Sequence, residues 1–163
     1  MHNLNWLINT SYTTLYAFLW ACMEIEIEGK DGWAANLPTT SFLESHFTWY
    51  HVFMNLIVSL TMGRLMWSQG GIFHCVFYIA EWFLLEDFLW FALNPDFGLE
   101  KYTPEHIWWH AKQPWYFGMP LHNYIALSAM MICSDWTKNK ELQKSWNFMI
   151  FVTLSFVILN NYI

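Results

Sequence analysis

Apolar residues occur in five long runs along the chain, separated by short polar or turn-forming stretches. The runs cover residues 4–23, 47–67, 72–93, 119–133 and 146–160. A helix that spans a bilayer needs about 20 predominantly apolar residues. The pattern therefore predicts an all-α integral membrane protein, a single domain over residues 1–163 built as a bundle of about five transmembrane helices.

Turn-forming residues mark the breaks between the runs. The Gly70-Gly71 pair leaves room only for a tight connection, which predicts an antiparallel hairpin of the second and third helices. Asn94-Pro95 ends the third run, because the residue before a proline is biased away from helix. Thr103-Pro104 is typical of a helix start, with a capping side chain followed by proline. Residues 104–112 are therefore expected to form a short interfacial helix between the third and fourth transmembrane helices.

The composition favours lipid as the surrounding solvent. Hydrophobic residues make up 56% of the 163 residues and charged residues only 12%, about half of the charged share that is usual in a soluble domain. A soluble domain of this length could not bury so much apolar surface. The 12 tryptophans fit a protein with two membrane interfaces. No basic cluster accompanies the net charge of −6, which excludes nucleic acid as a partner.

Basic residues differ slightly between the two ends of the predicted bundle. With five crossings, the N-terminus, the Gly70-Gly71 turn and the 135–145 loop share one face, which carries Lys138, Lys140 and Lys144, with Arg64 near it. The other face carries three lysines. The positive-inside rule then places the N-terminus in the cytoplasm. If the first or the fourth run does not cross, the parity of the topology changes.

The same topology brings titratable residues from separate stretches to the opposite, non-cytoplasmic end. They end the first run, begin the second, lie within the third, belong to the short helix or open the fourth. A charged group at the centre of a bilayer costs on the order of 3 kcal/mol, so ionisable residues in such segments are candidates for a functional site. The candidates are Glu24, Glu26, His51, Glu81, Glu86, Asp87, His106, His110 and His122.

The spacing of these residues along the chain suggests which of them bind a metal and which act as acids or bases. On a helix, His106 and His110 point to one face, and that spacing suits two ligands of one metal ion. Three acids of the third run cannot all face one site, because residue 86 lies about 140° from residue 81 and residue 87 a further 100° round the helix. Glu24, Glu26 and Glu81 are interpreted as catalytic acids or bases. The proposed metal ligands are His51, Glu86, Asp87, His106, His110 and His122.

Mixed imidazole and carboxylate ligation suits several transition metals. Iron, zinc and manganese accept both ligand types, and copper suits an all-imidazole set. Two acids with several histidines could also hold a pair of irons, as in other helical bundles. The predicted cofactor is therefore a transition metal ion, iron, zinc or copper, in a mononuclear or dinuclear centre. The corresponding function is a membrane oxidoreductase or hydrolase that acts on a hydrophobic or lipid-like substrate.

Three other interpretations remain open from the sequence alone. Each histidine or acid taken singly also fits a structural hydrogen-bond network or a solvated helix end. Acids and histidines near an interface can form a proton or cation carrier. The chain could also be a non-catalytic subunit of a larger membrane complex, or form a homo-oligomer.

Overall fold

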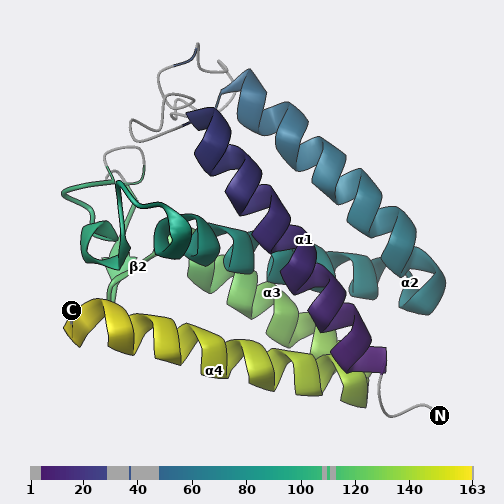
Figure 1. Cartoon of the computed structure of the whole chain (residues 1–163). Helices are drawn as coiled ribbons and strands as arrows, with labels where there is room; N and C mark the ends of the chain where they lie inside the picture. Colours follow the sequence, from purple (N-terminus) through teal and green to yellow (C-terminus); the bar gives the residue numbers. More distant parts are fainter. Residues whose placement is uncertain (1–4, 29–36, 38–47, 108–109, 111–112, 163) are drawn as a thin grey trace.

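The computed structural model describes residues 5–28, 37, 48–107, 110 and 113–162. In these residues the chain is an all-α bundle of α1 (Asn5–Glu28), α2 (Trp49–Leu93), α3 (Leu121–Thr137) and α4 (Lys140–Tyr162). Figure 1 shows α1 beside the first half of α2 and across its second half, with α4 along the lower edge of the view. The prediction of a helical bundle is confirmed.

A break in α2 turns this helix into a hairpin (Figure 1). Gly71 has φ 64° and ψ −150°, a conformation that only glycine adopts readily. A Cβ on Gly70 would collide with the His74 imidazole, so that ring would have to move if residue 70 carried a side chain. The Cys75 thiol donates a hydrogen bond of 3.2 Å to the Gly63 carbonyl, which joins the two halves. The predicted hairpin is confirmed, and the described helical segments correspond to the five apolar runs.

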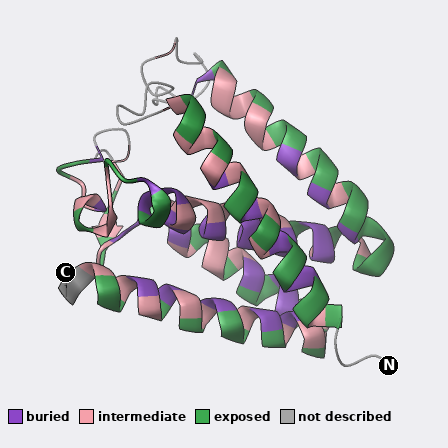
Figure 2. Cartoon of the chain, in the orientation of Figure 1, coloured by how far each residue is buried: buried purple, intermediate pink, exposed green. Residues whose placement is uncertain are grey.

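On α1, polar side chains face the bundle and large apolar side chains face outward. Its buried positions include Asn9, Thr10 and Thr13. In contrast, Ile8 is 63% exposed and Leu19 is 56% exposed. Figure 2 shows this division along the helices, with buried positions facing the bundle and exposed positions facing outward. The outer surface of α1 is therefore more apolar than the side that it packs.

One helix in the described part of the chain, Lys140–Asn160 within α4, is long and apolar enough to cross a membrane. The prediction of five helical segments therefore holds, whereas five membrane crossings remain a prediction. The inward-facing asparagine and threonines of α1 give this helix a more polar character than a simple lipid-spanning segment.

The connection between α2 and α3 differs from the predicted interfacial helix. It contains the 3-10 turn η3 (Leu99–Lys101) and the antiparallel two-residue strands β1 (Trp115–Tyr116) and β2 (Met119–Pro120). Within the predicted helix, residues 104–106 and 110 form turns and Ile107 belongs to no helix or strand, whereas residues 108–109 and 111–112 lie outside the described residues. Tertiary packing explains the absence of the predicted helix, because Tyr102 and Ile107 are both fully buried and hold this part of the chain against the bundle.

An aromatic cluster fixes this connection to the helices. The rings of Phe88 and Phe156 stack with centroids 4.0 Å apart, which joins α2 to α4. Tyr102 packs edge-on against Phe156 at 5.0 Å and against Phe91 at 4.7 Å. The Asn160 side chain donates a hydrogen bond of 3.2 Å to the Tyr102 carbonyl. These contacts hold Tyr102, and with it η3, against α2 and α4.

Candidate metal site

Two histidines and one aspartate converge at this end of the bundle. Asp87 comes from the second half of α2, His110 from the α2–α3 connection and His122 from the first turn of α3. Each offers one atom able to bind a metal, and these atoms lie within 4.8 Å of one another. The His122 Nε2 atom is 3.4 Å from Asp87 Oδ2, and the two imidazole centroids are 4.6 Å apart.

A hydrogen-bonded chain orients the Asp87 carboxylate. The Tyr102 hydroxyl donates to Asp87 Oδ2 at 2.9 Å, and the Asn123 amide donates to the Tyr102 oxygen at 2.7 Å. Burial raises the pKa of Tyr102 well above its usual value, and the adjacent Asp87 charge raises it further. The phenol therefore stays protonated at neutral pH and remains a donor to the carboxylate.

The Gln113 carboxamide contacts both imidazoles. Its Oε1 atom lies 3.0 Å from His122 Nδ1 and 3.2 Å from the His122 backbone nitrogen. Its Nε2 atom lies 3.0 Å from His110 Nδ1. The Trp115 indole donates a hydrogen bond of 3.1 Å to the His110 carbonyl, which fixes the backbone of that histidine.

Burial lowers the pKa of His110 to about 4, although the negative charge of Asp87 opposes this shift. The imidazole is therefore neutral at pH 7. Neutral imidazole is the form that binds a metal ion, because a protonated ring has no free nitrogen lone pair.

Two further acids lie next to the Asp87–His110–His122 site. The Glu24 and Glu86 side chains hydrogen-bond to each other, and both lie within electrostatic reach of Asp87. Two carboxyl groups in such contact must share a proton, because two like charges at that distance repel strongly. The Trp20 indole donates to Glu24 at 3.2 Å. The Glu86 Oε1 atom is buried and has no hydrogen-bond partner in the described part of the chain.

The other predicted site residues lie in different surroundings. His51 hydrogen-bonds to Thr48 at 2.7 Å at the start of α2. A positive charge on His51 lowers the pKa of His110. His106 is exposed and hydrogen-bonds to Thr103 at 3.0 Å. Glu26 is exposed on α1. The structure therefore brings together a subset of the predicted ligands and leaves His106 and Glu26 at the surface.

Glu81 belongs to a separate polar network. It is fully buried, and the Ser145 hydroxyl lies 3.4 and 3.5 Å from its two carboxylate oxygens. Ser145 also hydrogen-bonds to Thr10, so the network joins α1, α2 and α4. The Asn9 amide also donates a hydrogen bond of 2.6 Å to the side-chain oxygen of the exposed Gln69, which joins α1 to α2. Glu81 thus lies in a different network from the candidate metal ligands. Its predicted role as a catalytic acid or base, shared with Glu24 and Glu26, stays a prediction.

Sequence reasoning did not identify Tyr102, Gln113 and Asn123, which orient the three ligands. Asn123 directly follows His122 in an otherwise apolar helix start, which is a usable signal. The Phe117-Gly118 turn between β1 and β2 is another, because both residues have positive φ and reverse the chain between Gln113 and His122. Tyr102 carries no comparable signal among many other aromatic residues.

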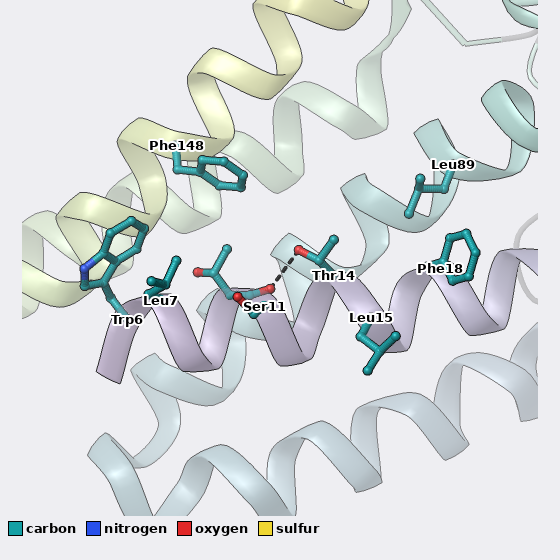
Figure 3. Close-up of a pocket in the computed structure, with 9 residues that line it drawn as sticks. Trp6, Leu7, Ser11, Thr14, Leu15, Phe18, Leu89 and Phe148 are labelled. Carbon is teal, nitrogen blue, oxygen red and sulfur yellow. Dashed lines mark hydrogen bonds between the residues drawn. The ribbon is translucent and has the colours of Figure 1, made fainter. Parts of the chain in front are cut away.

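The structure also contains an open apolar groove of about 500 Å³ lined by residues of α1, the second half of α2 and α4 (Figure 3). The Thr14 hydroxyl in its wall donates to the Thr10 carbonyl at 2.7 Å, as the dashed line in Figure 3 shows, so its hydrogen bond is made within the helix. None of the candidate metal ligands lines the groove. Its walls are Trp6, Leu7, Thr10, Ser11, Thr14, Leu15, Phe18, Leu89 and Phe148.

The ligand set is of a recognised chemical type. Two imidazoles and one carboxylate leave coordination positions open for water or substrate, an arrangement that suits non-haem iron(II) and also catalytic zinc. No known protein family, curated protein or solved structure matches the chain. Function is therefore inferred from the chemistry of Asp87, His110 and His122.

Proposed function

We propose that the chain is a small integral membrane metalloprotein that binds a divalent transition metal through Asp87, His110 and His122. One observation carries the proposal: ligand atoms from three separate stretches of chain lie within 4.8 Å of one another. Iron and zinc suit this mixed set best, and copper is the third candidate. Glu86 and Glu24 lie within electrostatic reach of Asp87 and are the candidate ligands for a second metal ion.

The apolar outer surface of α1 supports the membrane location. Apolar side chains such as Ile8 and Leu19 face outward on α1, while Thr13 faces inward. A large exposed apolar surface on a soluble monomer favours aggregation, whereas lipid accepts it at no cost. The apolar stretch of α4 is long enough to cross a bilayer.

The open coordination positions support an enzyme. A metal bound by three protein ligands can activate water for hydrolysis or support oxidation. The Glu24–Glu86 pair, which shares a proton, is the adjacent candidate for the general acid or base. A hydrophobic or lipid-like substrate is proposed because the surrounding helices expose apolar side chains.

A proton carrier is the second candidate, favoured by the position of Glu81. A carrier needs polar groups that continue from one end of the bundle toward the other. Buried Glu81 and Ser145 lie on the far side of the site from the α2–α3 connection, and the Asn9–Gln69 contact lies near the Gly70-Gly71 turn. This candidate predicts proton flux into liposomes that is lost in Glu81→Gln, without any change in metal content.

Metal analysis of detergent-purified protein, expressed with excess iron, zinc and copper, tests the proposal. We expect about one equivalent of metal per chain, lost in His110→Ala and His122→Ala, because two remaining ligands bind weakly. His106→Ala is the matched control and should keep its metal, since His106 is exposed and bonded to Thr103. Less than about a tenth of an equivalent in the wild-type protein would overturn the proposal.

A further inference from the structure

Glu81 lies in the interior of the bundle with hydroxyl groups as its polar neighbours. Its side chain is fully buried, and the Ser145 hydroxyl donates to its two carboxylate oxygens at 3.4 and 3.5 Å. Ser145 also hydrogen-bonds to the Thr10 hydroxyl. No ion pair joins Glu81 to a lysine, arginine or histidine of the described residues. A buried carboxylate without a cation carries a large desolvation penalty, so Glu81 needs a proton to remain neutral.

A series of polar side chains leads from Glu81 to the surface at the hairpin end of the bundle, where α2 breaks. The Tyr78 hydroxyl, one turn before Glu81, is within hydrogen-bonding reach of the Ser145 and Asn9 side chains. Asn9 in turn donates to Gln69 at 2.6 Å. Ser145 and Tyr78 are fully buried, whereas Gln69 is exposed. The polar groups therefore continue from the buried carboxyl group to water at the hairpin end.

In the opposite direction, the Glu81 network meets an aromatic layer formed by Tyr16, Trp20 and Trp82. The Trp82 ring is buried, with its centroid 6.0 Å from that of Tyr16 and 5.7 Å from that of Trp20. On α1, the two rings of the layer come after Thr10 and before the end of the helix that carries an acid of the candidate metal site. In the described part of the chain, no hydrogen bond crosses this layer to the acids beside the metal site.

We propose that Glu81 is a proton-binding site that exchanges with water through Ser145 and Tyr78 at the hairpin end, while the aromatic layer closes the opposite route. The Glu81 proton passes to the Ser145 oxygen as the Ser145 proton passes to the Tyr78 oxygen. The Tyr78 proton then leaves to a water molecule that enters when the Asn9–Gln69 contact opens. Each hydroxyl accepts one proton and donates another, so only Glu81 becomes charged, and the reverse path restores its proton.

This inference deepens the proton-carrier candidate, and its use in transport rests on that candidate. Buried acids in membrane proteins commonly serve in proton relays. A carrier exposes its binding group to one side of the membrane at a time. The structure corresponds to the state in which Glu81 faces the hairpin end, and transport would require the aromatic layer to open. The exchange of the Glu81 proton with water is a property of the resting protein and does not require transport.

Infrared spectroscopy of the full-length protein in detergent, after transfer from H₂O to D₂O, measures this exchange. The carbonyl band of a protonated carboxyl group shifts when deuterium replaces its proton, and Glu81→Gln identifies the Glu81 band by removing it. Tyr78→Phe keeps the ring but removes the hydroxyl, so exchange then requires a larger local opening of the bundle and should slow at least about tenfold. Asn9→Ala should speed exchange, because water reaches Tyr78 directly.

Tyr16→Phe is the matched control, because it removes a hydroxyl from the aromatic layer on the other side of Glu81. It should exchange at the wild-type rate, and slowing equal to that of Tyr78→Phe would overturn the assignment of the entry side. Ser145→Ala removes the other hydroxyl of the route and should also slow exchange, so it decides the question if Tyr78→Phe does not fold. Wild-type exchange rates in both route variants would overturn the route. A spectrum in which Glu81→Gln removes no band of a protonated carboxyl would overturn the proton-binding site.

Proton flux into liposomes separates this inference from the carrier candidate. Slowed exchange in Tyr78→Phe without any wild-type flux would support the proton-binding site and remove the carrier candidate. Wild-type flux that persists undiminished in both Tyr78→Phe and Ser145→Ala would overturn the proposed route.

Discussion

At the scale of single residues, the site depends on side chains that local sequence patterns identify only in part. Helical phase predicted that Glu81, Glu86 and Asp87 cannot all serve one site, and the structure places Glu81 in its own network with Ser145. The pairing of His106 with His110 assumed a helix that does not form over residues 103–106. His110 meets His122 because a turn and two short strands reverse the chain, which is a tertiary feature.

The low pKa of His110 predicts a pH dependence of stability. Burial lowers this pKa to about 4 in the folded protein, whereas an unfolded chain binds the proton near pH 6.5. The unfolded state therefore binds more protons between these values. The free energy of unfolding should fall as the pH drops from about 6.5 to about 4, by up to about 3 kcal/mol.

Thermal unfolding of metal-stripped protein in detergent, followed across this pH range, measures the effect. The stability of the wild-type protein relative to His110→Gln should decline as the pH falls, because glutamine does not titrate. His106→Gln, at an exposed position, should keep the wild-type profile. Parallel stability curves for wild-type and His110→Gln would show that His110 titrates normally and would contradict the prediction.

At the scale of elements, turn-forming residues predicted the boundaries well because their effect is local. The Gly70-Gly71 pair breaks α2 where the sequence placed a hairpin, and Asn94 ends the helix before Pro95. The Thr103-Pro104 signal failed because burial of Tyr102 and Ile107 determines the path of that segment. Helix-start signals act over one turn and do not outweigh such packing.

Two glycines of α2 offer a matched test of the hairpin. Gly71 has φ 64° and ψ −150°, whereas Gly63 lies within the helix, and an added Cβ meets no atom within 4 Å at either position. Gly71→Ala should lower the free energy of unfolding by about 1–3 kcal/mol, through backbone strain alone. Gly63→Ala should instead raise it by up to about 1 kcal/mol, because alanine favours helix.

Thermal or denaturant unfolding of both variants in the same detergent gives the comparison. The opposite signs make the test robust to general effects of an added methyl group. A Gly71→Ala protein as stable as Gly63→Ala would contradict the hairpin conformation at residue 71.

At the scale of the whole molecule, a helical bundle with an apolar outer surface carries a polar site at one end. The all-α architecture followed from the apolar runs, because their length and glycine breaks are visible in sequence. The inward-facing threonines of α1 and the groove beside it depend on packing. The convergence of Asp87, His110 and His122 depends on three elements together, and a single sequence does not contain that geometry.

X-ray absorption of zinc-loaded, full-length protein in detergent tests the central claim most directly. The account predicts two imidazole nitrogens and at least one oxygen at about 2.0–2.2 Å from the metal. One imidazole contribution should disappear in His122→Ala, while His106→Ala should leave the spectrum unchanged. A zinc ion surrounded by oxygen alone, or an identical spectrum in His122→Ala, would contradict a metal centre formed by these three residues.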